Sequence, residues 1–317
     1  MRRWHYRYAG LRIESEWPIP EWAVFARDEP PGPADVHIRQ AREAENPAEP
    51  QPPPADFRFS IPAVGDFSIR HGREIVVSPV PAADEDEVRL FLLGSAWGAL
   101  CYQRGMLAMH ASVVRTGSGA VAFCGAPGAG KSTLAAWLTA RGYDLVSDDL
   151  CCFDIGGAEA LAFPSAPRLK LWSEALAALG WSREGLARDQ SRTDKFILSL
   201  PRDERPGRTE PVPLRAICVL TWGDPALTRL RGMTALQRLV GAATYRPSYI
   251  ESLGKTGPYW EQCFKLARMT PVWTLSRPRE WAAMAEILGQ LACQWPASGT
   301  TSCSGRIDKP TNTRRQS

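Results

Sequence analysis

Residues 125–132 read GAPGAGKS, and this stretch constrains the fold more than any other part of the chain. It matches the pattern G-x-x-x-x-G-K-[ST] in full, between the apolar run AVAFC and the helix-like run TLAAWLTARG. A strand, a glycine-rich loop and a helix in that order distinguish a working phosphate loop from a chance match or a structural turn. We therefore expect a mixed α/β fold whose loop binds a nucleoside triphosphate.

The residue types in this loop suit the binding of phosphate. Gly125, Gly128 and Gly130 allow backbone conformations that turn successive N–H groups towards phosphate oxygens. Lys131 can reach the β- and γ-phosphates, Ser132 can ligate Mg²⁺, and the dipole at the helix N-terminus favours anions. The contacts expected with ATP come from Gly125, Ala126, Pro127, Gly128, Ala129, Gly130, Lys131, Ser132 and Thr133.

Two adjacent acids, Asp148 and Asp149, follow the helix that begins at the loop. We expect that helix to end at Arg141-Gly142 and YDLVS to form a short strand with both acids at its C-terminal end. Ligands of open α/β sheets bind at the carboxyl ends of strands, so a strand near the loop would direct both carboxylates to the γ-phosphate. One could hold Mg²⁺ and the other accept a proton from an attacking hydroxyl. The alternative is that one acid caps a following turn.

His110 can be placed by strand register. ASVV and AVAF are β-rich runs separated by the turn signal RTGSG. A turn centred on Gly117-Ser118 pairs residues whose numbers sum to about 235, which puts His110 opposite Gly125. The imidazole would then lie beside the loop, where it could orient or polarise Asp148. The alternative is a structural histidine at the start of a strand.

The chain divides into three parts by its residue patterns. Residues 1–83 are expected to form a β-rich N-terminal domain with a mobile Pro-rich loop at 28–55. Residues 84–295 are expected to form the catalytic domain. It begins with a helix whose first turn carries Asp84 to Glu87 and which stops near Gly105. Residues 296–317 are polar and basic, and we expect this tail to be disordered.

Further elements are expected after the acidic pair. PRLKLW, PLRAICVLTW and PVWTLSRP are typical of strands, whereas TALQRLVGAAT and PREWAAMAEILGQLACQW are typical of helices. A short helix over SEALAALG is expected to have Ser173 as its N-cap and Gly180 as its stop.

Composition excludes several classes of protein. The formal charge of +4 and the pI near 8.6 fall well short of a nucleic-acid-binding signature. The N-terminus MRRWHYRYAG has no apolar core of a signal peptide, and no run approaches the roughly 18 apolar residues of a membrane span. The eight cysteines form no C-x-x-C pair and favour buried thiols over disulfides or zinc. We expect a cytoplasmic protein with neither nucleic-acid nor membrane partners; homo-oligomerisation is left open.

The core motifs together resemble the C-terminal catalytic domain of HPr kinase/phosphorylase. In that family a His opens a strand, a phosphate loop follows, and a helix ending in R-G-H/Y leads to a strand ending in Asp-Asp. The matching residues are His110, GAPGAGKS, Arg141-Gly142-Tyr143 and Asp148-Asp149, within residues 106–150. The resemblance implies a core related to the nucleotide-binding domain of phosphoenolpyruvate carboxykinase. It also implies that Asp148, assisted by His110, activates a substrate Ser hydroxyl, while Asp149 and Ser132 serve Mg²⁺.

The chain departs from that family after the Asp-Asp pair. The bifunctional enzymes carry a Glu-x-Arg-Gly signature that supplies another metal ligand, and here the nearest basic stretch is PSAPRLKLW. The resemblance therefore does not extend to phosphorolysis, to a second-metal role or to HPr as substrate. Arg168 and Lys170 could replace the lost charge, Lys195 could meet the γ-phosphate or the acceptor, and Arg246 could belong to a substrate-facing loop. The alternative for each is a solvated or structural base.

Other segments resemble a divergent branch of the family. YRYAGLRIESEWPIPEW, RLFLLGSAWGALCYQRGMLAMHAS and PRLKLW are similar to HPr-kinase-like proteins from biosynthetic clusters of ribosomally made peptides. Some of those, the lasso-peptide precursor kinases, phosphorylate a Ser at the end of a precursor peptide. The first hypothesis is thus an ATP- and Mg²⁺-dependent kinase of a Ser in a peptide or protein. The alternatives are a kinase of a small hydroxylated metabolite and a non-catalytic, nucleotide-gated binding module.

Overall fold

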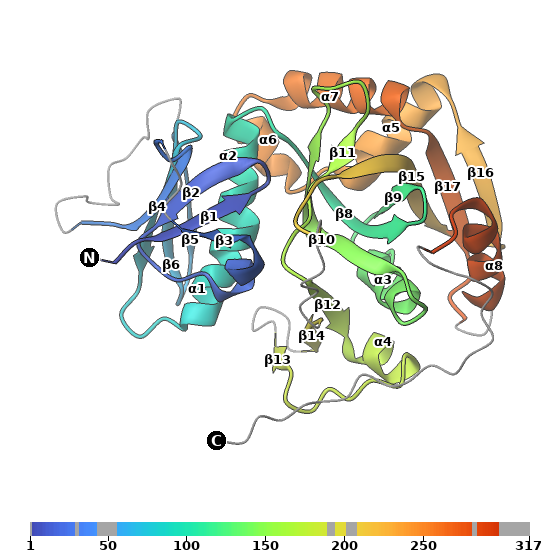
Figure 1. Ribbon diagram of the computed structural model, residues 1–317, viewed down its shortest axis with the longest axis horizontal. Helices are drawn as coiled ribbons and strands as arrows, with labels where there is room; N and C mark the ends of the chain where they lie inside the picture. Colours follow the sequence, from blue (N-terminus) through green and yellow to red (C-terminus); the bar gives the residue numbers. More distant parts are fainter. Residues whose placement is uncertain are drawn as a thin grey trace.

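The computed structural model describes residues 2–28, 32–42, 56–188, 194–200, 208–280 and 284–297. Within these residues the chain forms two seven-stranded sheets, a three-stranded sheet and helices that lie between and around them (Figure 1). The expected mixed α/β class is confirmed at this level.

The N-terminal residues form the first seven-stranded sheet, in the order β3-β1-β2-β4-β7-β6-β5. Its strands are β1 (Trp4–Tyr8), β2 (Leu11–Ser15), β3 (Ala26–Arg27), β4 (Val36–Gln40), β5 (Asp56–Ile61), β6 (Gly65–Arg70) and β7 (Glu74–Pro79), with a 3₁₀ helix, η1 (Pro20–Phe25), before β3. Strand β4 pairs in parallel with both β2 and β7. The interval 28–55 therefore contains a central strand and is not a loop throughout; residues 29–31 and 43–55 lie outside the described part.

A helical segment connects the first sheet to the second. It consists of α1 (Glu85–Phe91), the π-helical turn η2 (Leu92–Ala96) and α2 (Trp97–Gln103), and it lies between the two sheets (Figure 1). The acidic run caps this helix as expected, although Asp84 is the N-cap itself, accepting hydrogen bonds from the backbone N–H groups of Asp86 and Glu87. Gly105 follows the end of α2 with φ +67°, as expected for a helix stop.

The second seven-stranded sheet holds the loop and the acidic pair. Its order is β11-β10-β8-β9-β15-β17-β16. The strands are β8 (Leu107–Thr116), β9 (Gly119–Cys124), β10 (Asp144–Asp154), β11 (Leu161–Ala162), β15 (Val212–Trp222), β16 (Ala226–Leu230) and β17 (Val272–Arg277). Because β15 is parallel to both β9 and β17, the carboxyl ends of these three strands meet at one edge of the sheet.

Both faces of the second sheet are covered. Val121 and Phe123 on β9 pack in the same cluster as α3 (Lys131–Thr139) and α8 (Met284–Gln294). The alternating residues Ala122 and Cys124 belong to the other cluster, with α5 (Gly232–Ala243) and α7 (Thr256–Met269). This alternation follows from the two-residue period of a strand and explains why β9 is apolar throughout.

A third, smaller sheet packs near α3. It has the order β12-β14-β13, formed by β12 (Arg168–Trp172), β13 (Ala187–Arg188) and β14 (Lys195–Ser199). The helix α4 (Ser173–Ala178) follows β12 directly, and Trp172 is its N-cap, so the expected N-cap role of Ser173 is wrong. Gly180 has φ +68° and ends this helical region as expected. The remaining helix is α6 (Pro247–Ser252).

One hydrophobic cluster runs from the first sheet through α2 into the second sheet. At its centre the ring of Trp97 lies 5.3 Å from Tyr8 and 5.2 Å from Trp22, measured between ring centroids. The aromatic residues of β1 and η1 thus hold the first sheet against the helix that borders the second. The domain boundary after residue 83 stays a prediction, and residues 298–317 of the basic tail lie outside the described part.

Two expectations from composition concern cysteines and the membrane. Of the seven cysteines described, all are free; six are buried and Cys293 is exposed, whereas Cys303 lies outside the described part. None of the described helices has the length and apolar character needed to cross a bilayer.

Replacing Trp97 with alanine should lower the free energy of unfolding by about 3–5 kcal/mol, because it leaves a cavity where three aromatic rings meet. Urea unfolding followed by circular dichroism measures this change. Trp260→Ala on α7 is the matched control, since that indole is 39% exposed, and its effect should stay within about 0.5 kcal/mol. Equal losses in the two variants would contradict the packing role of Trp97.

Candidate functional site

The glycine-rich loop joins β9 to α3, as its sequence context predicts. Gly128 and Gly130 have φ values of +82° and +75°, a region that favours glycine. A Cβ atom on Gly130 would also lie 2.3 Å from Nη2 of Arg277. Glycine at 130 is therefore required by both the backbone conformation and the close approach of a guanidinium.

Lys131 folds back onto the loop that precedes it. Its Nζ donates hydrogen bonds to the carbonyl oxygens of Gly125, at 2.8 Å, and Ala126, at 3.3 Å. Burial lowers the pKa of this lysine below its usual value. Lys131 thus places a cation within the curve of the loop while the helix α3 begins at the same residue.

The register predicted for His110 is confirmed. Strand β8 pairs antiparallel with β9, and Ala111 lies opposite Cys124. The next position in this register places His110 opposite Gly125. However, His110 contacts Asp149 and not Asp148: its Nδ1 donates to the Asp149 carbonyl oxygen at 3.0 Å and lies 3.4 Å from Oδ1 of the same residue. The imidazole thus contacts Asp149, the neighbour of the acid that His110 was expected to orient or polarise.

Tyr245 packs beside the imidazole, with 6.0 Å between the ring centroids. The helix on its other side must leave room for this ring. A Cβ atom on Gly98 would lie 2.9 Å from Cε1 of Tyr245, and one on Gly94 would lie 3.2 Å from its hydroxyl oxygen. The two glycines of the GSAWG stretch thus let Tyr245 fit between the helix and His110.

The strand that carries the acidic pair is longer than expected. Strand β10 continues to Asp154 and pairs with β8, so the pair lies in mid-strand and one strand removed from β9. The ladder shifts by one residue between Leu145 and Ser147, and Asp149 has φ +73°. A bulge and a left-handed residue break the alternation of a strand, which re-aims the side chains that follow. This is why both carboxylates take part in one polar cluster.

Asp148 is held by hydroxyl groups from two elements. Ser112 on β8 donates to its Oδ1 at 2.5 Å, and the hydroxyl of Ser132 at the start of α3 also forms a hydrogen bond with it. Burial raises the pKa of Asp148 above its usual value, and the neighbouring charge of Asp149 adds to the rise, whereas the serine hydrogen bonds oppose it. Asp148 is thus connected directly to the loop through Ser132.

Asp149 is held by positive charge. Nζ of Lys170 lies 3.0 Å from its Oδ2, and the lysine side chain is 12% exposed. Burial by itself would raise the pKa of Asp149, but the charge of Lys170 and the contact with His110 hold it well below the usual value. This carboxylate is therefore ionised across the physiological range of pH.

These groups line one cleft with a volume of about 950 Å³, within the range of small-molecule sites. The loop contributes to its wall together with His110, Asp149 and Lys170. Leu90, Phe91, Gly94 and Ser95 from α1 and η2 form another part of the wall, to which Leu90 and Phe91 contribute apolar side chains. The cleft thus joins the glycine-rich loop, Asp149 of the acidic pair and the N-terminal helical segment.

The four basic residues noted in the sequence fall in different places. Lys170 pairs with Asp149, and Lys195 lines the cleft with its Nζ 6.0 Å from the ring centroid of Trp172. Arg246 lines the cleft in a left-handed conformation, φ +44°. Arg168 does not line it; its Nη1 lies 3.7 Å from Oε1 of Glu21 in the 3₁₀ helix η1.

Arg277, at the end of β17, is a cleft residue that sequence reasoning missed. Its Nη2 donates to the carbonyl oxygen of Ala129 inside the loop, and burial lowers the pKa of Arg277 to about 10, which leaves it charged at neutral pH. A usable signal existed in the sequence, because PVWTLSRP places an arginine at the end of an apolar strand. Ligands of open α/β sheets bind at the carboxyl ends of strands, and this rule, which identified the acidic pair, applies to Arg277 as well.

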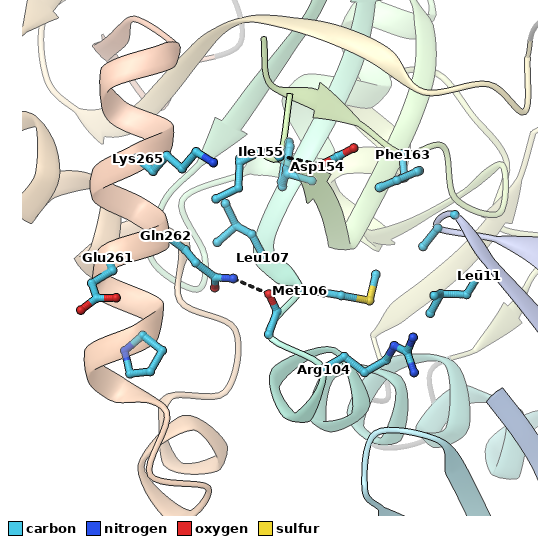
Figure 2. A pocket seen from close by; sticks show the side chains of 16 residues that line it. Leu11, Arg104, Met106, Leu107, Asp154, Ile155, Phe163, Glu261, Gln262 and Lys265 are labelled. Carbon is cyan, nitrogen blue, oxygen red and sulfur yellow. Dashed lines mark hydrogen bonds between the residues drawn. The ribbon is translucent and has the colours of Figure 1, made fainter. Parts of the chain in front are cut away.

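A second pocket, of about 690 Å³, lies at the start of β8 and the end of β10 (Figure 2). Arg104, Asp154, Glu261 and Lys265 contribute charged groups to it, and the side-chain amide of Gln262 donates to the Gly105 carbonyl across its floor. Its lining includes none of the catalytic, nucleotide-binding or metal-binding residues predicted from the sequence.

Oxygen donors near the loop determine whether Mg²⁺ can bind there. Among the described residues, no group of three His, Cys, Asp or Glu side chains is placed to hold a metal ion. Ser132 and Asp148 nevertheless lie together, as a hydroxyl and a carboxylate in mutual contact. Mg²⁺ is typically bound by one or two protein oxygens, with water and substrate phosphates supplying the rest. The pair therefore fits a magnesium ion bound with a nucleotide.

No family model matches the chain. No curated protein matches it either. Among solved structures, the chain is similar to the Hpr(Ser) kinase/phosphatase from Coxiella burnetii, at 11% identity and a TM-score of 0.32 over 59% of this chain and 97% of that chain. A kinase/phosphatase is thus a structural neighbour at a low TM-score, and a likeness of this size carries no argument about chemistry.

Replacing Lys170 with methionine should destabilise the fold by about 3 kcal/mol at pH 7, because the carboxylate of Asp149 loses its buried partner. A carboxyl group with a lowered folded pKa contributes stability above its unfolded pKa, near 4, and loses it as pH falls through the folded value. The difference between variant and wild type should therefore shrink below about pH 4.

Urea unfolding between pH 3 and pH 7 measures this difference. Lys265→Met on α7 is the control, since this lysine is exposed and should show no comparable dependence on pH. A deficit for Lys170→Met that stayed constant over the whole range would contradict the pairing with Asp149.

Proposed function

We propose that this chain is an ATP-dependent, Mg²⁺-requiring kinase that transfers the γ-phosphoryl group to a Ser hydroxyl of a peptide or protein. One observation carries the proposal. The glycine-rich loop with Lys131 opens onto the same cleft as Asp149, which His110 and Lys170 hold in place. A phosphate-binding loop facing an oriented carboxylate is the arrangement that phosphoryl transfer to a hydroxyl requires.

The family resemblance implies that Asp148 activates the hydroxyl and that Asp149 serves Mg²⁺. The contacts in this structure favour the reverse assignment. Asp148 touches Ser132, so these two would hold Mg²⁺, which would neutralise charge on the phosphates when bound. Asp149 lines the cleft, so it would accept the proton of the attacking hydroxyl. His110 would act as a positioning residue, since its Nδ1 donates to the Asp149 backbone.

The proposed transfer forms one P–O bond and breaks another. The acceptor oxygen attacks the γ-phosphorus and forms a new P–O bond, while the bond from that phosphorus to the bridging oxygen breaks and ADP leaves. The hydroxyl proton passes to the carboxylate of Asp149. Lys131, together with the backbone N–H groups of the loop, stabilises the negative charge on the transferred group.

A peptide acceptor is supported by the part of the cleft wall that comes from the N-terminal helical segment. This wall is formed by Leu90, Phe91 and Gly94 of the helical segment that the first sheet holds in place. An apolar wall beside the reacting groups can contact side chains that flank a Ser in a peptide. A precursor peptide of a ribosomally made product is the specific acceptor that the sequence resemblance suggests.

The proposal is tested with γ-labelled ATP and an array of Ser-containing peptides. Wild-type protein should label at least one peptide on Ser. Asp149→Asn should lower kcat by a factor of about 10²–10⁴ and leave ATP affinity within about threefold. Asp148→Asn should raise the Mg²⁺ concentration needed for half-maximal rate and recover in part at high Mg²⁺. Asp66→Asn, on β6 of the first sheet, is the control and should transfer at the wild-type rate.

Other outcomes identify the alternatives. Transfer by Asp149→Asn at the wild-type rate would refute the proposed proton acceptor. Turnover of a small hydroxylated metabolite without labelling of any peptide would identify a metabolite kinase. A nucleotide-dependent interaction that Lys131→Ala abolishes, without phosphoryl transfer to any acceptor, would identify a binding module.

A further inference from the structure

The carboxyl ends of β9, β15 and β17 meet at the same edge of the second sheet. Strand β9 leads into the glycine-rich loop, β15 ends at Trp222 and β17 ends at Arg277. Trp222 and Arg277 are direct neighbours in the parallel ladder between β15 and β17. All three features line the same cleft, so a ligand bound to the loop can reach the two side chains.

Trp222 is unusually exposed for an aromatic residue on this sheet. Its exposed fraction is 40%, whereas Phe123 on the adjacent strand β9 is 1% exposed. The indole is not buried in the core, and part of its surface lines the cleft. Flat aromatic surface of this kind stacks well with nucleobases, which all present a π-face.

Two guanidinium groups accompany the indole. The central carbon of Arg277 lies 4.3 Å from the ring centroid of Trp222, and that of the exposed Arg279 lies 5.2 Å from it. Arg277 also donates to the carbonyl of Ala129 in the loop. One buried side chain therefore couples the position of the indole to the conformation of the loop, and the second guanidinium is exposed to solvent.

The indole and the acidic pair lie on opposite sides of the loop strand. In the order β10-β8-β9-β15-β17, Asp149 belongs to β10 and Trp222 to β15. A nucleotide whose γ-phosphate lies near Asp149 and whose nucleoside extends along this edge of the sheet, away from β10, brings its base towards β15. The γ-phosphate end of the nucleotide is thus expected near β10, and its nucleobase end near β15.

We infer that Trp222, with Arg277 and Arg279, forms the nucleobase subsite of the cleft and binds the base of the nucleotide by stacking. This inference rests on the proposed function only in requiring that the loop binds a nucleoside triphosphate. Arg277 holds the indole at a fixed place relative to the phosphates, and Arg279 adds a cation beside the stacked base. The subsite determines affinity for the nucleoside, whereas the loop determines affinity for the phosphates.

Trp172 is a second exposed aromatic residue of the cleft on which a nucleobase could stack. It is 43% exposed and lines the same cleft. It differs in place, since β12 packs against β10 and α3, and Nζ of Lys195 lies near its ring. This position is on the side of the acidic pair, where the acceptor binds in the proposed reaction. The two tryptophans can be separated by experiment.

The test is isothermal titration calorimetry with two probes, ATP and inorganic tripolyphosphate, each with Mg²⁺. Trp222→Ala should raise the Kd for ATP at least fivefold, because a stacked base is worth about 1–3 kcal/mol, and should leave the Kd for tripolyphosphate within twofold. Trp222→Phe should keep ATP affinity within about threefold, since it retains an aromatic face. Trp260→Ala, outside the cleft, is the control and should change neither value.

Several results would overturn the inference. These are an unchanged ATP affinity in Trp222→Ala, an equal loss for both probes, a selective loss in Trp172→Ala, or wild-type protein that binds tripolyphosphate as tightly as ATP. In each of these the loop still binds phosphate, so the proposed function survives. Wild-type protein that binds neither probe would remove the proposed function, and the subsite with it.

Discussion

The antiparallel ladder between β8 and β10 positions the acidic pair and His110 relative to one another. It places Asp148 opposite Ser112 and Asp149 opposite Ala111, so that His110, the residue before Ala111 in β8, reaches the Asp149 backbone. Lys170 then approaches from β12 and closes the cluster. If this register slipped by one residue, the carboxylates would exchange faces and the cluster would be lost.

Backbone strain at Asp149 is part of this arrangement. A left-handed aspartate within a strand is unfavourable by about 1–2 kcal/mol, and it persists because several interactions hold it. These are the lysine ion pair, the imidazole hydrogen bond and the ladder on both sides of the residue. Strain of this kind concentrates at functional sites, where a precise orientation of a side chain matters more than local stability.

The N-terminal sheet contributes to the cleft indirectly. Its aromatic residues hold the segment α1–α2 against the second sheet, and the π-helical turn in that segment contributes Gly94 and Ser95 to the cleft wall. π-Helical turns are frequent at functional sites because they shift the side chains that follow. Tyr245 packs closely against Gly98 on one side and beside His110 on the other. The position of this helix therefore affects the position of the imidazole.

Much of the local structure could be predicted from residue patterns. The loop between a strand and a helix, the capped helix after residue 83 and the pairing of β8 with β9 all follow from local signals, because they depend on residues close together in the chain. The extension of β10 could not be predicted in this way. CCFD continues an apolar strand, but the two acids before it resemble a strand end until β8 is known to pair across them.

The sequence by itself determined that a glycine-rich loop with Lys131 precedes a helix and that two acids follow, since these are matters of residue type and spacing. Only the tertiary structure decided which acid meets His110 and which meets Ser132. It also brought Arg277, 147 residues after Gly130 in the numbering, onto the loop. The physical reason is that strand order and register are set by non-local packing, and a bulge with one left-handed residue re-aims neighbouring side chains without any local signal.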